Sequence, residues 1–353
     1  MSGNGLLERN GVGATRAVRL ATSDRPRPDW EGLVARFGGG FFHSAAALHS
    51  ALPEGEPLFA TLLAGSGEPV GIAIGATQRC RLGVSARHVR LAAPPALAGG
   101  VDRTAACGVL VEGLAAEGAV EIAVDSFDSE GEAPVLGGEP GRERDEHVVE
   151  LEPEATALLA RFGTTHRRHI RRGERSGLRL ETPQGPAALE MLYNVQSSAG
   201  RRAAGRGNRF TASQVRSAAT TAFGAFDEPS GLAVAAATLE GQVLTAVLVG
   251  WAGGRAFYLQ GGSTPRGYSE HAAAWLHYRL MVDLAGRGFT HYNLGGTPAA
   301  AQDPSHPQHG LFRFKQHFDA RLARCRGARW IVRPGHLRMH SLLNAIAGRL
   351  RAA

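Results

Sequence analysis

Lysine occurs once in this chain of 353 residues, at position 315, although lysine and arginine together number 39. Arginine spreads its charge over a planar fork, whereas lysine carries a compact ammonium that can sit against a single oxygen atom. A chain that uses arginine at every other basic position therefore favours a role for Lys315 that arginine cannot fill, with chance retention as the alternative. Such an ammonium suits the stabilisation of an oxyanion that forms at a carbonyl carbon.

The segment before Lys315 contains two glycine pairs, and each pair closes a predicted strand. The predicted order is a strand over 257–260 ending at Gly261 and Gly262, a helix over 270–285, and a strand over 289–294 ending at Gly295 and Gly296. A strand, helix and strand of this length imply parallel neighbours, and ligands of such sheets gather at the carboxyl ends of the strands. We therefore expect a ligand site at both glycine pairs.

The same segment offers groups for chemistry at a carbonyl carbon. We expect the Lys315 ammonium to stabilise the oxyanion, with the backbone amides of Gly295 and Gly296 as helpers. His291 and Asn293 alternate onto one strand face. His291 is better explained as a hydrogen-bonded structural histidine, and Asn293 is no base. The sequence thus names a cation for the reaction and leaves the proton acceptor open.

A second concentration of charge is a run of arginines on a predicted helix that ends at Gly177. At about 100° per residue, one face of this helix presents Arg168, Arg171, Arg172 and Arg175. Guanidinium groups placed so close together repel one another unless anions lie between them. The run therefore favours a phosphate-binding surface, with a solvated face that contributes only solubility as the alternative.

Motifs in both regions resemble one protein family. They are the segments 257–263 (FYLQGGS), 292–296 (YNLGG), 312–315 (FRFK) and 165–177 (THRRHIRRGERSG). The first three resemble the C-terminal half of the Fem-type (FemAB-like) aminoacyl-tRNA-dependent acyltransferases and their relatives in the GNAT superfamily. The fourth is similar to the arginine-rich helix that opens the second domain of that family.

The resemblance implies an α/β (mixed α+β) fold of two tandem GNAT-like domains, each a mixed, twisted sheet flanked by helices. The length agrees, because 353 residues exceed what one core usually fills. We expect a disordered N-terminus at 1–14, a first domain at 15–150, a second domain carrying the active site at 151–335, and a C-terminal amphipathic helix at 336–353. The two sheets are expected to be separate and to pack side by side.

The resemblance also implies which residues bind substrates. Arg167 and Arg168 align best with the basic residues that family members direct toward the nucleotide or pyrophosphate of a substrate. The full expected set is catalytic Lys315 and substrate-binding Arg167, Arg168, Arg171, Tyr258, Gly261, Gly262, Asn293, Gly295, Gly296, Arg313 and Phe314. We expect neither a metal ion nor a cofactor.

One segment departs from the GNAT pattern. GNAT enzymes hold the CoA pyrophosphate on a Gln/Arg-x-x-Gly-x-Gly/Ala loop at a helix N-terminus. The corresponding residues here, 265–270, read PRGYSE. This difference favours aminoacyl-tRNA over acyl-CoA as the acyl donor.

Composition limits the partners and the location. A formal net charge of +7 and a pI of about 10.0 favour an anionic partner such as nucleic acid, a nucleotide-linked sugar, CoA or an acidic membrane surface. The cysteines Cys80, Cys107 and Cys325 form no metal or disulfide pattern. The sequence begins without a signal peptide, and no apolar run reaches the roughly 18 residues of a membrane helix. We therefore expect a cytoplasmic protein with at most weak association with a membrane surface.

The leading hypothesis is an N-acyltransferase that moves an aminoacyl group from aminoacyl-tRNA to an amine and forms an amide bond. The amine acceptor would be a cell-wall precursor or a small natural product, and a nucleotide-linked or lipid-linked acceptor is open. One alternative keeps the fold and uses acyl-CoA as the donor. An alternative of another class is a non-catalytic RNA-binding protein; DNA is not expected as a partner.

Overall fold

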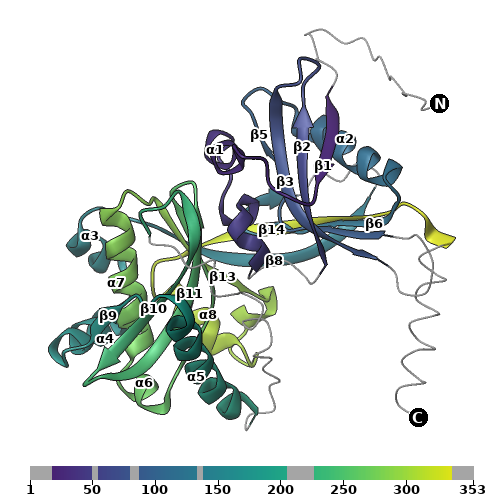
Figure 1. Ribbon diagram of the computed structural model, residues 1–353. Helices are drawn as coiled ribbons and strands as arrows, with labels where there is room; N and C mark the ends of the chain where they lie inside the picture. Colours follow the sequence, from purple (N-terminus) through teal and green to yellow (C-terminus); the bar gives the residue numbers. More distant parts are fainter. Residues whose placement is uncertain (1–17, 50–54, 80–86, 133–137, 205–225, 336–353) are drawn as a thin grey trace.

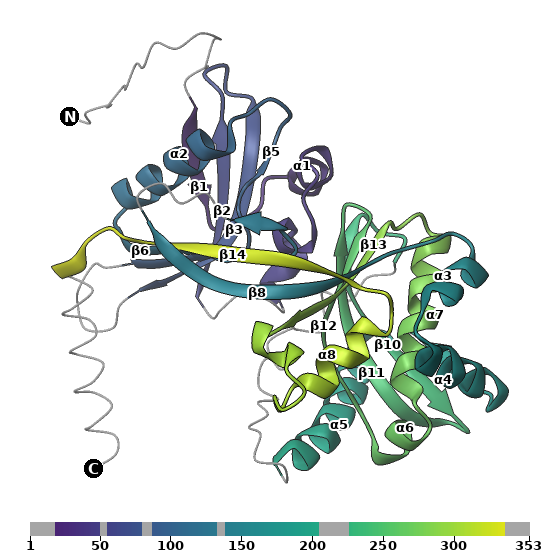
Figure 2. The ribbon, with the colours of Figure 1, turned by 180° about the vertical axis from the view of Figure 1, so that it is seen from behind.

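The computed structural model describes residues 18–49, 55–79, 87–132, 138–204 and 226–335. The N-terminus expected to be disordered and the expected C-terminal amphipathic helix lie outside these residues. Figure 1 shows two lobes joined by two long strands, β8 (Glu139–Glu150) and β14 (Arg321–Ile331). The view from behind in Figure 2 shows the same two strands running side by side from one lobe to the other.

The described strands form one mixed sheet. Besides β8 and β14 they are β1 (Arg19–Ser23), β2 (Glu56–Leu63), β3 (Pro69–Arg79), β4 (Arg87–Leu91), β5 (Ala96–Leu97), β6 (Ala119–Val124), β7 (Gly131–Glu132), β9 (Arg179–Glu181), β10 (Ser230–Leu239), β11 (Gln242–Ala252), β12 (Arg255–Ser263) and β13 (His291–Thr297). Their order is β1-β2-β3-β4-β6-β14-β8-β13-β12-β11-β10-β9, with β5 on β3 and β7 on β14.

The expectation of two separate sheets is wrong, because β8 pairs with β13 on one side and with β14 on the other. Strand β14 in turn pairs with β6 of the first lobe, although sequence reasoning assigned residues 321–331 to the second domain. The acidic segment 125–146, expected as an irregular excursion, supplies the first part of β8. The mixed α/β fold and the sheet flanked by helices are confirmed. The domain limits near residue 150 stay a prediction, since the sheet does not break there.

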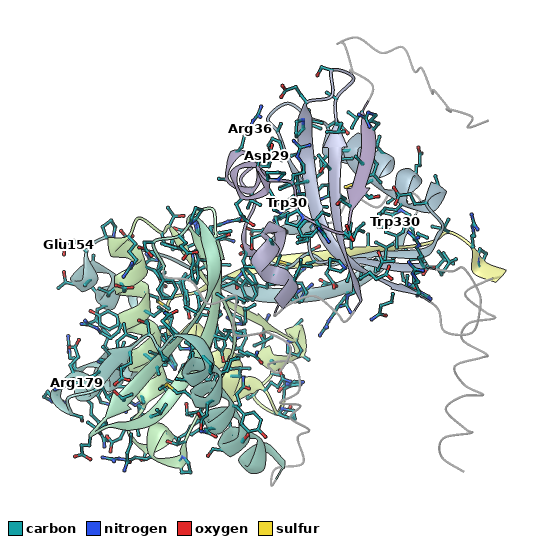
Figure 3. All side chains as sticks on the ribbon, in the orientation of Figure 1. Asp29, Trp30, Arg36, Glu154, Arg179 and Trp330 are labelled. Atoms are coloured by element: carbon teal, nitrogen blue, oxygen red, sulfur yellow. The ribbon has the colours of Figure 1, made fainter. Side chains whose placement is uncertain are left out.

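The first lobe buries apolar residues on both faces of its strands. The helices α1 (Trp30–Arg36) and α2 (Arg103–Ala116) lie over opposite faces. Strand β2 shows why both faces are covered: Phe59 packs against the ring of Trp30 in α1, while Leu58, Ala60 and Leu62 belong to the core under α2. Figure 3 places Trp30 and Trp330 in this lobe and Glu154 and Arg179 in the other.

The second lobe is built on an antiparallel meander of β10, β11 and β12. Its helices are α3 (Ala155–Arg161), α4 (Thr164–Arg175), α5 (Gly185–Ala204), α6 (Pro265–Ser269), α7 (Ala272–Gly286) and α8 (His309–Gln316). Alternate residues of β10 pack into two cores, one that includes α7 and one that includes α5. The nearly continuous apolar runs of β10 and β11 follow from burial on both faces.

A short 3₁₀ segment from the N-terminal part of the described chain packs against the second lobe. This segment, η1 (Phe41–His43), buries Phe41 and Phe42 completely or nearly so. The Phe42 ring meets the Phe257 ring of β12 edge to face at a centroid distance of 4.8 Å. A side chain at Gly250 of β11 would collide with the Phe41 ring at 2.4 Å. The two lobes therefore share a packed core as well as a sheet.

None of the described helices is both long and apolar enough to cross a membrane.

Candidate active site

Strands β12 and β13 are parallel, as predicted, but they separate after three residues. The ladder joins Arg255–Phe257 to His291–Asn293 and then ends. Beyond it, β13 continues beside β8 with an irregularity between Asn293 and Gly296. Gly295 lies at this irregularity with φ +73°, a conformation that favours glycine. The end of the ladder thus coincides with the glycine pair at which the sequence predicts a site.

The ammonium of Lys315 lies at this irregularity. Lys315 is on the last turn of α8 and is only 4% exposed. Its Nζ donates hydrogen bonds to the carbonyl oxygens of Gly295 and Gly296, each at 3.0 Å. Burial lowers the pKa of Lys315 to about 8, against the opposing influence of Glu146. The lone lysine is therefore a buried cation held by two backbone oxygens.

The glycine pair binds Lys315 through its carbonyls, not its amides. The N–H of Gly295 donates to Oδ1 of Asn293 at 2.8 Å. The expectation that the Gly295 amide assists an oxyanion is therefore wrong, because that amide is already engaged. An ammonium has three N–H donors, and two of them point to the glycine carbonyls. Among the described residues the third donor has no hydrogen-bond partner, which leaves it for a ligand oxygen.

A buried histidine positions α8 and with it Lys315. His147 of β8 accepts a hydrogen bond at Nδ1 from Nε2 of Gln316 at 3.2 Å, so its Nε2 carries the proton and donates to Oγ1 of Thr297 at 2.9 Å. Burial, followed by the charge of Lys315, lowers the pKa of His147 to about 3, and the ring stays neutral. Gln316, the residue next to Lys315, is thus hydrogen-bonded to His147 of β8, which in turn is hydrogen-bonded to Thr297 of β13.

Two carboxyl groups that sequence reasoning missed meet at Asn293. Its Nδ2 donates to Oε2 of Glu146 at 2.8 Å and to Oδ1 of Asp128 at 3.1 Å. Burial, followed by the negative charge of Asp128, raises the pKa of Glu146 to about 7, and burial also raises the pKa of Asp128. Among the described residues, no group of three or more His, Cys, Asp or Glu side chains could hold a metal ion.

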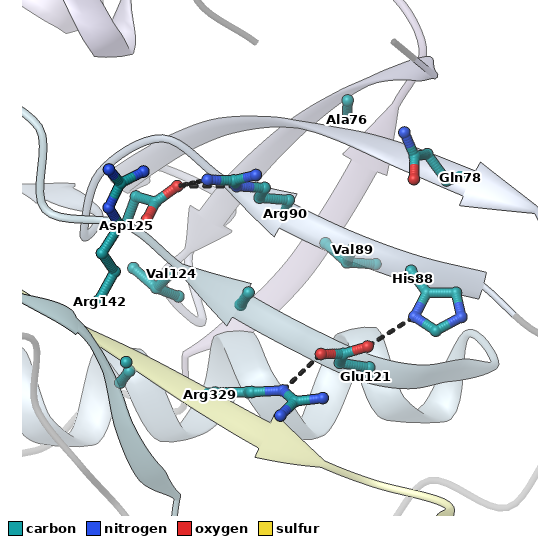
Figure 4. Close-up of a pocket in the computed structure, with 13 residues that line it drawn as sticks. Ala76, Gln78, His88, Val89, Arg90, Glu121, Val124, Asp125, Arg142 and Arg329 are labelled. Carbon is teal, nitrogen blue, oxygen red and sulfur yellow. Dashed lines mark hydrogen bonds and ion pairs between the residues drawn. The ribbon is translucent and has the colours of Figure 1, made fainter. Parts of the chain in front are cut away.

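Polar contacts continue from Glu146 into the first lobe. Arg144 lies 3.8 Å from Oε1 of Glu146 and 3.6 Å from Oδ1 of Asp125, and Asp125 pairs with Arg90 at 2.7 Å. Asp125 and Arg90 line a cavity of about 450 Å³ on the sheet face opposite α2 (Figure 4). His88, Glu121 and Arg329 form a second charged group at its other end, joined by hydrogen bonds. This cavity does not include Lys315.

The arginine-rich helix was predicted correctly, and its charges face solvent. In α4 the residues His166, Ile170 and Gly173 are buried, whereas Arg168, Arg171 and Arg175 are exposed. Within the described residues no ion pair involves these three arginines. Arg172 pairs with Glu270 at 3.1 Å, and the half-buried Arg167 makes only a 3.5 Å contact with the carbonyl of Ala160. The sequence anticipated no partner for Arg172 outside its own helix.

The arginines do not touch Lys315, but the two are linked through packed rings. The buried His166 ring of α4 lies 5.0 Å from the Phe314 ring and 4.3 Å from the Phe318 ring. The helix that carries the arginines is therefore connected to the helix of Lys315 through a packed aromatic core. Phe314, expected to bind substrate, contributes to this core instead, and Arg313 is exposed.

The first glycine pair has a packing role. A side chain at Gly261 would meet the Ala246 carbonyl at 2.6 Å, and one at Gly262 would meet the Val195 carbonyl of α5 at 2.8 Å. Tyr258 packs edge to face on His277, and burial raises its pKa to about 12. Close approach of α5 and β11 to β12 thus explains both glycines without a ligand.

The segment that replaces the GNAT pyrophosphate loop uses its own backbone donors. Thr264 caps α6 by accepting from the Gly267 N–H at 3.0 Å, and the N–H groups of Tyr268, Glu270 and His271 bond to carbonyls within the segment. Both terminal nitrogens of Arg266 are occupied by Gln242 and Glu240. A phosphate would have to displace these internal bonds to reach the four amides.

Comparison with known proteins gives one family match and several similar folds. Residues 160–316 match the family described as Acetyltransferase (GNAT) domain, and that stretch runs from just before α4 to the residue after Lys315. The fold is similar to the crystal structure of FemX, with a TM-score of 0.60 and 14% identity over 81% of this chain and 90% of that chain. It is also similar to a conserved protein of unknown function from Bacteroides thetaiotaomicron, with a TM-score of 0.53 and 11% identity over 88% and 99% of the two chains. No curated protein matches the sequence. The match over residues 160–316 indicates an acyltransferase.

The raised pKa of Glu146 predicts how stability depends on pH. The folded protein holds a proton up to about pH 7 that the unfolded chain releases near its ordinary pKa of 4.5, so the free energy of unfolding falls as the pH rises between these values. Glu146→Gln carries no charge and avoids this loss. We expect it to be more stable than the wild type by on the order of 2 kcal/mol at pH 8, and about equal to it near pH 4.

Urea unfolding at the two pH values measures this difference. Glu143→Gln is the matched control, since Glu143 lies on the same strand but is exposed. An effect of Glu146→Gln that is equal at both pH values would contradict the buried, protonated carboxyl group.

Proposed function

We propose that the protein transfers an aminoacyl group from aminoacyl-tRNA to an amine acceptor and forms an amide bond. The observation that carries the proposal is the lone lysine, buried with one free N–H donor where β12 and β13 separate. An aminoacyl ester is already activated, so the enzyme needs to hold donor and acceptor together more than it needs a strong nucleophile. The remaining demand is for a group that stabilises the negative charge on the carbonyl oxygen.

Lys315 meets that demand in the proposed reaction. The amine nitrogen bonds to the ester carbonyl carbon, and the carbonyl oxygen becomes an oxyanion that accepts the free N–H of the ammonium. Collapse of this intermediate breaks the bond to the ribose oxygen, which leaves as a hydroxyl, while the amine gives up one proton. Removing a comparable oxyanion donor from other enzymes costs about 3 to 4 kcal/mol of transition-state stabilisation.

Two further features support tRNA as the donor. Four backbone amides of the loop at 264–271 are hydrogen-bonded within the loop, which argues against binding of the acyl-CoA pyrophosphate there. The exposed arginines of α4 offer unpaired charge to a phosphate backbone. The fold similarity to FemX agrees with the Fem-type motifs around the two glycine pairs. The proposed acceptor is an amine on a cell-wall precursor or small natural product, and the proposed location is the cytoplasm, where charged tRNA is found.

Donor consumption tests the proposal. The protein is incubated with charged tRNA or with acyl-CoA in the presence of a pool of amine acceptors, and the loss of each donor is followed by mass spectrometry. We expect loss of charged tRNA above the rate of spontaneous hydrolysis, with a new amide product. Loss of acyl-CoA alone would replace the proposal with acyl-CoA-dependent transfer. RNA binding without loss of either donor would favour a non-catalytic RNA-binding protein.

Substitution of the lysine tests its role as the oxyanion donor. Lys315→Met is expected to lower turnover by about 100-fold or more and to leave donor affinity nearly unchanged, because the interaction exists mainly in the transition state. Lys315→Arg keeps the charge but spreads it over a fork that cannot fit against both glycine carbonyls, so most of the loss should persist.

Single-turnover kinetics and donor binding separate this role from substrate binding. If Lys315 binds substrate phosphate instead, arginine should substitute well and the defect should appear in KM. Full activity of the methionine variant would dispose of both roles.

The exposed arginines predict a salt dependence. If Arg168, Arg171 and Arg175 hold phosphates together with one neighbouring group, about four contacts to single-stranded backbone give a slope near −3 for log affinity against log salt. Fluorescence anisotropy of labelled tRNA over a range of salt concentrations measures this slope. The triple alanine variant should flatten the slope by about 2, and an affinity of the wild type that ignores salt would exclude the arginine surface as an RNA site.

A further inference from the structure

The proposed reaction leaves one proton without a destination. An amine that forms an amide bond loses an N–H proton, and Lys315 cannot accept it while it acts as the cation. His277 lies near Lys315, but burial lowers its pKa to about 3 and its Nδ1 is bonded to the Tyr292 hydroxyl. The GNAT-matched stretch thus supplies a cation and, near it, no ready proton acceptor.

Glu146 and Asp128, two carboxyl groups from outside that stretch, meet at Asn293, and the charge of Glu146 opposes the effect of burial on the pKa of Lys315. Glu146 is 1% exposed, and its Oε2 accepts from Nδ2 of Asn293 and from the backbone N–H of Asp128 at 3.1 Å. Its Oε1 has no hydrogen-bond partner among the described residues, and the nearest charged donor, Nε of Arg144, lies 3.8 Å away, beyond hydrogen-bond distance. A buried carboxylate oxygen without a donor is costly, so its presence calls for an explanation. A proton, or a donor brought by a substrate, would satisfy it.

The carboxyl group and the ammonium flank the same glycine. Glu146 is the register partner of Gly296 in the β8–β13 ladder, and the Gly296 carbonyl accepts from Lys315. Gly296 itself is exposed, so this part of the ladder borders solvent. Asn293 links Glu146 to the glycine pair that binds Lys315, because it donates to Glu146 and accepts from the N–H of Gly295.

We propose that Glu146, paired with Asp128 through Asn293, is the proton acceptor for the attacking amine. This rests on the proposed function and adds to it. As the nitrogen bonds to the carbonyl carbon, its proton passes to Oε1 of Glu146 and negative charge develops on the oxygen next to Lys315. The ribose oxygen then leaves and takes up a proton, and Glu146 returns to its charged form. One proton leaves nitrogen and one joins oxygen, so the reaction balances.

The surrounding charges set the pH range of this step. The groups that face the carboxyl pair are Arg144 of β8, Arg255 of β12, His291 of β13, Lys315 of α8 and Cys325 of β14. Asp125, which follows β6, pairs with Arg144. Burial outweighs the nearby arginines, and the pKa of Glu146 stands near 7, close to the working pH that suits a general base. Activity should rise as the coupled pair loses a proton and fall as Lys315 loses its own near pH 8.

The first test is Glu146→Gln, which keeps the shape and can still accept from Asn293. We expect kcat/KM to fall by about 100-fold or more and the acidic limb of its pH profile to disappear, while donor binding stays within about twofold. Glu143→Gln on the same strand should leave both the rate and the profile unchanged. A Glu146→Gln enzyme with wild-type rate and an intact acidic limb overturns the proposal.

A second variant separates chemistry from structure. The double variant Glu146→Gln with Asn293→Asp exchanges the amide and the carboxyl group across the same hydrogen bond. It should regain at least about tenfold of the lost rate together with an acidic limb. A folded double variant as slow as Glu146→Gln counts against the proposal.

Failure of the proposal for Glu146 can be distinguished from failure of the proposed function. If the wild type consumes acyl-CoA and not charged tRNA, the donor assignment fails, and the same variants assayed with acyl-CoA still decide the role of Glu146. If it consumes neither donor, both proposals fall.

Discussion

The burial of one ammonium among backbone oxygens is the constraint on which the rest of the site depends. A buried charge is costly unless hydrogen bonds satisfy it, and the carbonyls of Gly295 and Gly296 satisfy two of the three donors of Lys315. Those carbonyls are free to do so because the β12–β13 ladder has already ended. This arrangement depends on the positive φ of Gly295, on the position of α8 and on the orientation of Asn293. The lysine keeps one donor for a ligand as a result.

The continuous sheet explains why the GNAT-matched stretch does not complete the site alone. Strand β8 is central to the sheet and passes from one lobe to the other. Its neighbouring residues Glu146 and His147 point to opposite faces, as successive strand residues must. His147 holds the helix of Lys315, and Glu146 reaches Asn293. A strand that begins in the first lobe therefore supplies the support of the cation from one face and, from the other, the carboxyl group that Asn293 binds.

Local patterns in the sequence predicted the parts of the site that depend on local chemistry. Apolar runs located β10 to β12, a charged periodicity located α4, and the solitary lysine and its glycine pair marked the place where β13 leaves β12. The single sheet was missed because the pairing of 139–150 with 321–331 joins segments far apart in the chain. The carboxyl pair was missed for the same reason, since burial by distant strands, and not spacing, gives Glu146 and Asp128 their properties. The Gly295 amide was misassigned because its direction depends on the positive φ angle of that residue at a bulge.

Because Lys315 is the only lysine in the chain, its ammonium can be observed directly. Protein grown with isotope-labelled lysine gives a single side-chain nitrogen resonance in NMR spectra that needs no assignment. A titration of that resonance should give a pKa near 8, and the signal should shift when a stable analogue of the tetrahedral intermediate at the tRNA 3′ end is added. A lysine that titrates near its ordinary pKa of 10.5 and does not respond to the analogue would contradict a buried cation poised at the reacting carbonyl.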